Sequence, residues 1–174
     1  MKFAYADPPY LGCGVKHYAQ HHADAAIWDD PETHRHLIAK LIAEYPDGWA
    51  MSLTSTTLHT ILPMCPSDVR IAAWMKTFAV FKKNVRNAYT WEPVIIRGGR
   101  KSSKDGAPVT RDSLAAPITL KRGLVGAKPE RFNRWVLDML GFIDGEDTLD
   151  DLFPGTAGMA RTLEAPPLNF GGVA

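Results

Sequence analysis

The chain has 174 residues, of which 45% are hydrophobic and 22% are charged, and its formal net charge is +1. This length suits one domain with a sizeable core, and near-neutrality argues neither for nor against nucleic acid, whose binding needs only a local basic patch. The two cysteines form no CxxC pair, which excludes a disulfide framework and a zinc ribbon, and no apolar run is long enough to span a membrane. We expect a single cytoplasmic domain over residues 1–174.

The first elements in chain order are a short strand and a helix. Residues 2–6 are apolar and predict a buried strand, which two prolines end at a rigid corner. Residues 30–45 predict a helix, because Asp30 can cap it, Pro31 can occupy its first position and apolar residues recur at helical spacing. The sequence PDG ends this helix.

The middle of the chain predicts further strands. Residues 49–54 and 69–75 are strand candidates, and the segment between them predicts a short helix broken near Pro63. Residues 87–99 predict a strand that Pro93 interrupts, because proline cannot donate to a strand ladder. We therefore expect this strand at an edge of the sheet or at a bulge.

The last third predicts a loop, a helix and a strand–turn–helix unit. Residues 97–113 are basic and aperiodic and predict a long mobile loop. Residues 128–142 predict a helix with Pro129 at its start and Gly141 at its end, and residues 148–165 predict a strand, a glycine turn and a helix. Strands that alternate with helices predict an α/β fold, with helices on both faces of the sheet.

Two loops follow predicted strands, where ligands of such sheets gather. The first is DPPY, residues 7–10, and its simplest interpretation is a rigid turn with a capping aspartate. Two fixed prolines also allow a carboxylate, a backbone carbonyl and a tyrosine ring to face one point. That set suits a planar base with an exocyclic amine, because the oxygens accept the amine hydrogens and the ring stacks on the base. The second loop, in DLFPGTAG (151–158), is by itself weak evidence for a ligand.

Together these loops resemble a known family. DPPY resembles the catalytic motif of S-adenosylmethionine-dependent amino-methyltransferases that act on nucleic-acid bases, especially N6-adenine DNA methyltransferases. DLFPGTAGM (151–159) is similar to their cofactor loop, and AKPERFNRWVLDML (127–140) resembles the Lys-Pro-led helix that often precedes that loop. The order of the three motifs matches the permuted members of the family. The resemblance implies a Rossmann-like methyltransferase sheet, permuted and shortened at its cofactor half.

The resemblance also implies a reaction: transfer of a methyl group from S-adenosylmethionine to the exocyclic N6 of adenine in DNA, without a metal. The amine hydrogens would be accepted by the catalytic corner and the base held by stacking on the tyrosine. The implied catalytic residues are Asp7, Pro8, Pro9 and Tyr10. The implied cofactor-binding residues are Asp151, Phe153, Gly155, Gly158, Lys128 and Pro129, although core packing is an equally good account of Phe153. For contact with phosphates we expect the basic residues Arg97, Arg100, Lys101 and Lys104.

Two departures from the family pattern bear on the cofactor. Ala157 stands where the second glycine of the cofactor loop is usual, and its methyl group hinders close approach of the backbone to a ligand. The given sequence ends soon after this loop and its helix, so we also expect no further strands after the cofactor loop and no acidic residue from them for the ribose. We expect that another residue substitutes, that the cofactor binds weakly, or that a second copy or a partner chain completes the site.

Other functions remain open at this stage. The chain could be a catalytically inactive methyltransferase-like subunit that binds nucleic acid or a partner, although such a module would not need the carboxylate of DPPY. It could also methylate RNA adenine or N4 of cytosine, although N4-cytosine enzymes more often carry serine at the first motif position. The histidines offer a weaker alternative, a metal site, since two of them stand four residues apart. The histidines considered are His17, His21, His22, His34 and His36, and the pair with this spacing is His17 and His21.

Overall fold

The computed structural model describes residues 1–20, 23–78, 84–101, 109–119 and 127–165. Its centre is a six-stranded sheet with the order β5-β3-β4-β2-β1-β6. Strand β1 runs parallel to its neighbours β2 and β6, β4 runs antiparallel to β2 and β3, and β5 runs parallel to β3. The strands are β1 (Lys2–Ala6), β2 (Gly48–Ser52), β3 (Arg70–Lys76), β4 (Trp91–Gly98), β5 (Ser113–Ala116) and β6 (Thr148–Asp151).

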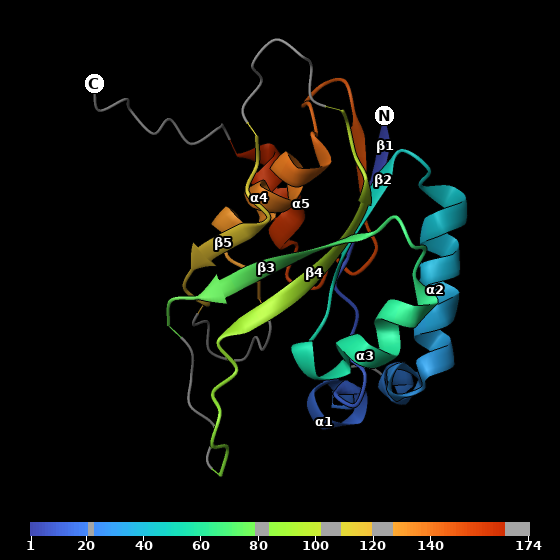
Figure 1. Cartoon of the computed structure of the whole chain (residues 1–174), viewed down its shortest axis with the longest axis vertical. Coiled ribbons are helices and arrows are strands. Elements are labelled where there is room, and N and C mark those ends of the chain that lie inside the picture. Colours follow the sequence, from blue (N-terminus) through green and yellow to red (C-terminus); the bar gives the residue numbers. More distant parts are fainter. Residues whose placement is uncertain (21–22, 79–83, 102–108, 120–126, 166–174) are drawn as a thin grey trace.

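Helices cover both faces of this sheet, as predicted (Figure 1). The α-helices are α1 (Gly14–Tyr18), α2 (Pro31–Glu44), α3 (Leu58–Ile61), α4 (Glu130–Leu140) and α5 (Gly158–Glu164). Three 3₁₀ segments join them: η1 (Ala23–Asp29), η2 (Ser55–Thr57) and η3 (Leu62–Met64). No described helix is both long and apolar enough to cross a membrane.

The alternation of side chains along the strands produces two buried clusters. On β1, Phe3 and Tyr5 pack in the cluster beneath α4 and α5, whereas Ala4 and Ala6 pack in the cluster beneath α2 and α3. Successive strand residues point to opposite faces, so one strand serves both cores. The strand that carries the DPPY corner is therefore anchored from both sides.

The predicted helix ends are confirmed in detail. The Asp30 side chain accepts a hydrogen bond from the Glu32 amide at the start of α2, which satisfies one of the unpaired amides there. Helix α4 ends at Gly141, whose φ of 65° lies in the left-handed region that glycine adopts without a Cβ penalty. These are local signals, and the sequence alone was sufficient to place them.

The prediction for Pro93 was wrong, because β4 is a central strand without a bulge. Pro93 lies opposite Ala73 in β3. The Ala73 amide points away from β4 and donates a hydrogen bond to the backbone carbonyl of Asp112 beside β5. On its other side β2 has already ended at Ser52, and the Leu53 amide donates to the Pro93 carbonyl. Proline has no amide hydrogen to donate, but the position of Pro93 lies just beyond the end of β2, so no hydrogen bond between paired strands is lost there.

The region of the predicted basic loop also differs from expectation. Its first residues, Arg97 and Gly98, belong to β4, and β5 begins at its last residue, Ser113. Strand β5 was not predicted, and neither were α1 and η1. Residues 102–108, with the predicted contact Lys104, lie outside the described part of the chain.

Candidate active site

The two predicted corners lie side by side because β1 and β6 are adjacent parallel strands. Tyr5 is opposite Asp151, and the Leu152 amide donates a 2.9 Å hydrogen bond to the Tyr5 carbonyl. Both strands end at the same edge of the sheet, so DPPY and FPGTAG leave it together. This is the position that ligands occupy in open α/β sheets.

A cavity of about 750 Å³ lies between these corners. It is lined by residues from the two loops, from the start of the Lys-Pro segment and from α1 and η1. Seven predicted site residues line it: Asp7, Pro9, Lys128, Asp151, Phe153, Gly155 and Gly158. Among the lining residues that were not predicted are Tyr18 of α1 and Asp24 and Trp28 of η1. Its volume is within the range of sites for small molecules and cofactors.

The Asp7 carboxylate is held by the Lys-Pro segment. The Lys128 ammonium donates to Asp7 Oδ1 at 2.9 Å and to the Tyr10 hydroxyl at 2.9 Å. The Tyr10 hydroxyl in turn lies 3.3 Å from Asp7 Oδ1. Among the described residues both contacts to Asp7 fall on Oδ1, which leaves Oδ2 for an incoming donor. The DPPY motif and the segment that leads into α4, which are 118 residues or more apart in the sequence, therefore form one hydrogen-bonded cluster.

Two residues that the sequence analysis missed complete this cluster from the neighbouring strands. Glu92, at the start of β4, accepts a 2.9 Å hydrogen bond from the Tyr10 hydroxyl and lies 3.5 Å from Lys128 Nζ. Lys76, at the end of β3, donates to the other oxygen of Glu92. An acid immediately before the apolar run PVII was the only local signal for Glu92, and nothing local pointed to Lys76.

The charges of this cluster shift one another's pKa values. Burial raises the pKa of Asp7 above its usual value, and the neighbouring Lys128 offsets part of that effect. Burial acts in the same direction on Glu92, but Lys128 and Lys76 outweigh it and hold the pKa of Glu92 below its usual value. Burial favours neutral Lys128, yet Asp7 and Glu92 together raise its pKa. Burial, followed by the charges of Asp7 and Glu92, raises the pKa of Tyr10, so this hydroxyl remains protonated.

The cofactor-like loop combines a carboxylate, an aromatic ring and unusual backbone. Asp151 Oδ1 accepts from the Phe153 amide at 3.2 Å, and burial raises the pKa of Asp151. Gly155 and Ala157 have φ values of 43° and 54°, so the turn is left-handed at both positions. Ala157 is exposed, and the cavity is lined by its neighbours Thr156 and Gly158 rather than by Ala157 itself.

Segment η1 lines part of the cavity and packs very closely on α1. A Cβ atom added at Gly14 would lie 2.1 Å from the Ala25 carbonyl oxygen, so only glycine fits there. The Asp29 carboxylate accepts from the Gly14 amide at 2.7 Å and so ties the two segments together. The Trp28 ring meets the Phe153 ring edge-to-face at 5.0 Å between centroids. Phe153 packs against a core cluster and also lines the cavity, and its role in binding a cofactor stays a prediction.

Comparison with known proteins identifies this fold. No protein-family model matches the sequence, and no curated protein matches it. Among solved structures, the chain is similar to the one titled "crystal structure of M1.HpyAVI-SAM complex", with a TM-score of 0.55 and 13% sequence identity. The match covers 94% of this chain and 76% of that chain. The predicted α/β sheet with helices on both faces is confirmed, and the chain shares its fold with that structure.

The remaining predicted residues lie elsewhere. Pro129 is the N-cap of α4 and Pro8 is a buried residue of the corner, and like Tyr10 neither residue lines the cavity. Arg97 pairs with Asp68 at 2.8 Å, and Arg100 pairs with Asp147 at 2.8 Å. Asp147 also binds the Met1 ammonium, so Arg100 lies near the start of β1, at the opposite end of the sheet from DPPY. The structure therefore does not bring Arg97 and Arg100 together with the cavity.

The histidines do not assemble in the described chain. No group of three or more His, Cys, Asp or Glu side chains that could hold a metal occurs within the described ranges. His34 is buried, with Nε2 3.0 Å from the Trp28 carbonyl, and burial lowers its pKa. His21 and His22 lie outside the described residues.

Proposed function

We propose that this protein transfers a methyl group from S-adenosylmethionine to the exocyclic N6 of adenine in DNA. The single observation that carries the proposal is the shared cavity, which Asp7 lines from one side and Phe153 and Gly155 from the other. The similarity in fold to a structure of a complex with S-adenosylmethionine adds support.

The lining of the cavity fits this cofactor, a cationic sulfonium joined to a nucleoside. Carboxylates of Asp7, Asp24 and Asp151 line the cavity and suit a cation, and the rings of Phe153 and Trp28 suit an adenine. We propose that Asp151, Phe153, Gly155 and Gly158 hold the cofactor, with Lys128 beside it and Pro129 starting the helix that follows Lys128. When bound, the cofactor supplies an electrophilic methyl group.

Within this proposal the protein acts by positioning and electrostatics. The amine lone pair of adenine is delocalised into the ring, and hydrogen bonds from the amine to Asp7 Oδ2 and the Pro8 carbonyl favour a pyramidal, more nucleophilic nitrogen. Lys128 offsets part of the effect of burial on the pKa of Asp7 and so favours its ionised form. The Tyr10 hydroxyl is fixed by Glu92, so that its ring is held in place to stack on the base. In duplex DNA the base must leave the stack to reach this corner.

The test is a tritium-transfer assay with labelled S-adenosylmethionine and DNA, followed by nucleoside analysis. We expect label in N6-methyladenine for the wild-type protein, no transfer by Asp7→Asn, and unchanged transfer by Asp68→Asn. The second variant is a matched control, because Asp68 is an ion-paired acid at the far end of the sheet. Label in N4-methylcytosine, or transfer to RNA alone, would refute the substrate assignment, and transfer by Asp7→Asn would refute the role of the corner.

A further inference from the structure

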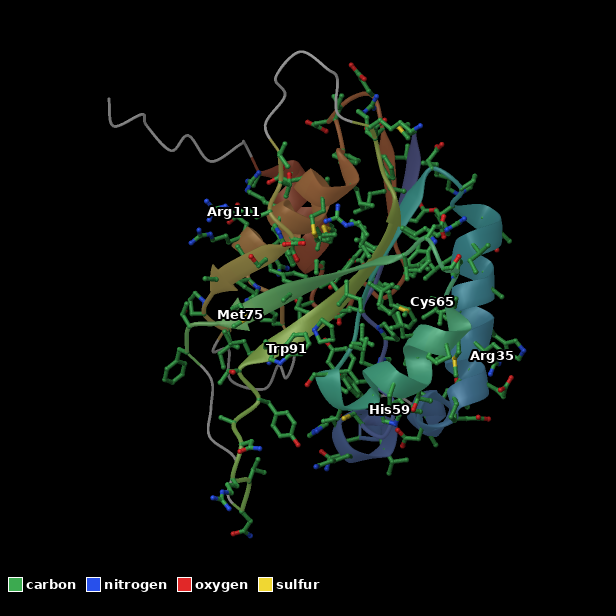
Figure 2. The ribbon with its side chains drawn as sticks, viewed as in Figure 1. Arg35, His59, Cys65, Met75, Trp91 and Arg111 are labelled. Carbon is green, nitrogen blue, oxygen red and sulfur yellow. The ribbon has the colours of Figure 1, made fainter. Side chains whose placement is uncertain are left out.

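Helix α1 carries a second tyrosine to the cavity, directly after the DPPY corner. The Cys13 amide at the start of α1 donates a 2.7 Å hydrogen bond to the Tyr10 carbonyl, which ties the helix to the corner. Gly14 and Tyr18 are four residues apart and share one face of α1, and Gly14 packs against η1. Figure 1 shows α1 at the end of the sheet where β1 terminates, and Figure 2 shows Trp91, the first residue of β4, toward the same end. Helix α1 is therefore held at the edge of the sheet where the cavity lies.

The hydroxyl of Tyr18 is available to a ligand. The side chain is half-buried and lines the cavity together with Asp7 and Lys128. Within the described ranges the Tyr18 hydroxyl has no hydrogen-bond partner, and it remains accessible, whereas the Tyr10 hydroxyl is already bonded to Glu92 and Lys128. Burial, followed by the charge of Asp7, raises the pKa of Tyr18, so its hydroxyl stays protonated and can donate. A free donor therefore lies in the cavity near the carboxylate of Asp7.

We propose that the Tyr18 hydroxyl donates a hydrogen bond to N1 of the target adenine, while Asp7 accepts hydrogen bonds from its N6 amine. The Watson–Crick edge of adenine presents an amine donor beside a ring-nitrogen acceptor, so it needs an acceptor and a donor side by side in the protein. Asp7 and Tyr18 supply that pair from the corner and from α1. The inference rests on the proposed function, because that function places the amine at Asp7.

This pair of side chains would select among the bases. Guanine and thymine present the opposite order, a carbonyl acceptor beside an N–H donor, which would leave both Asp7 and Tyr18 without a matching partner. Unpaired polar groups in a site of this kind are costly, so the site rejects such bases. Cytosine presents the same order as adenine. Tyr18 is therefore inferred to select an amino base, rather than adenine over cytosine.

The test compares two short, fluorescently labelled single strands of DNA, one with a single adenine and one with 1-deazaadenine in its place. The analogue keeps the amine and replaces N1 by C–H. With saturating S-adenosylhomocysteine, the demethylated cofactor, the wild type should bind the adenine strand about five-fold more tightly, the effect of one hydrogen bond. Tyr18→Phe should bind both strands equally, with an unchanged Tm because the hydroxyl has no partner within the described ranges. Tyr45→Phe is the matched control and should keep the preference, since its hydroxyl bonds to Asp150 and Tyr45 does not line the cavity.

The outcomes separate this inference from the proposed reaction. A preference for adenine that persists in Tyr18→Phe would overturn the inference, and so would a wild type that binds both strands equally, whether or not methyl transfer is found. A loss of S-adenosylhomocysteine affinity in Tyr18→Phe, measured by calorimetry, would assign the hydroxyl to the cofactor and would also overturn it. A preference that disappears in Tyr18→Phe and persists in Tyr45→Phe would support the inference. The same result in a protein that transfers no methyl group would refute the reaction alone.

Discussion

Ala157 is an alanine in a conformation that favours glycine, and we predict that Ala157→Gly stabilises the protein. Its φ of 54° and ψ of 32° lie in the left-handed region, where a Cβ atom costs roughly 1–2 kcal/mol. Glycine removes that cost but makes the unfolded chain more flexible, which costs about 0.4–1 kcal/mol. The balance is a gain of roughly 0.5–1 kcal/mol. For a chain of this size this gain corresponds to a rise in Tm of about 1–4 °C.

The assay is thermal unfolding followed by circular dichroism, with Ala160→Gly as the matched control. Ala160 is exposed within α5, three residues further along, and there the same change should lower stability by about 1 kcal/mol. The two substitutions are chemically identical, so only backbone conformation can give them opposite signs. A fall in Tm for Ala157→Gly as large as that for Ala160→Gly would refute the assignment of strain to the cofactor-like loop.

Two further predictions concern the buried charges. Replacing Lys128, whose side chain is 8% exposed, by Met leaves Asp7 and Glu92 facing each other, and we expect a loss of about 3 kcal/mol in the free energy of unfolding by urea denaturation. Burial already raises the pKa of Asp7, and the loss of Lys128 would raise this pKa further. In the wild type, the acidic limb of the pH profile of kcat/KM should therefore lie above the usual pKa range of aspartate, and any residual activity of Lys128→Met should show this limb at a still higher pH. An acidic limb at the same pH in both proteins would contradict this account. Hydrogen bonds from the Met1 ammonium, followed by those from Arg100 and the Ile143 amide, hold the pKa of Asp147 below its usual value, so its contribution is present above pH 4 and lost in stronger acid. Asp147→Asn should therefore be less stable than the wild type at pH 7, with a difference that shrinks as the pH falls below 4; a constant difference would contradict the assignment.

Local patterns predicted several of the elements that build the site, but not α1 and η1. The caps at Asp30 and Gly141 and the strand–turn–helix pattern of residues 148–165 each depend on neighbours within a few residues, so the sequence shows them directly. The fold class followed from the alternation of strands and helices. The resemblance of the two corners to family motifs implied that they serve one site, and the parallel pairing of β1 with β6 brings both corners to the same edge of the sheet.

The features that were missed depend on long-range pairing. Pro93 is tolerated in a central strand because β2 ends at Ser52, and the register of two distant strands cannot be derived from the sequence around the proline. Glu92 and Lys76 reach the corner only because β3 and β4 run together to that edge of the sheet. The same strand direction carries Arg97 to the opposite end, which a pattern of charges along the chain does not reveal.

The most direct test of the central claim is calorimetric titration of the purified protein with S-adenosylmethionine. We predict saturable binding by the wild type and markedly weaker binding by Phe153→Ala, because this ring lines the cavity. Phe142→Ala is the matched control, since Phe142 is also a partly buried ring packed on a core cluster but does not line the cavity. Binding that only Phe153→Ala weakens would support a cofactor site between the two corners. No binding by the wild type, or equal binding by both variants, would contradict it.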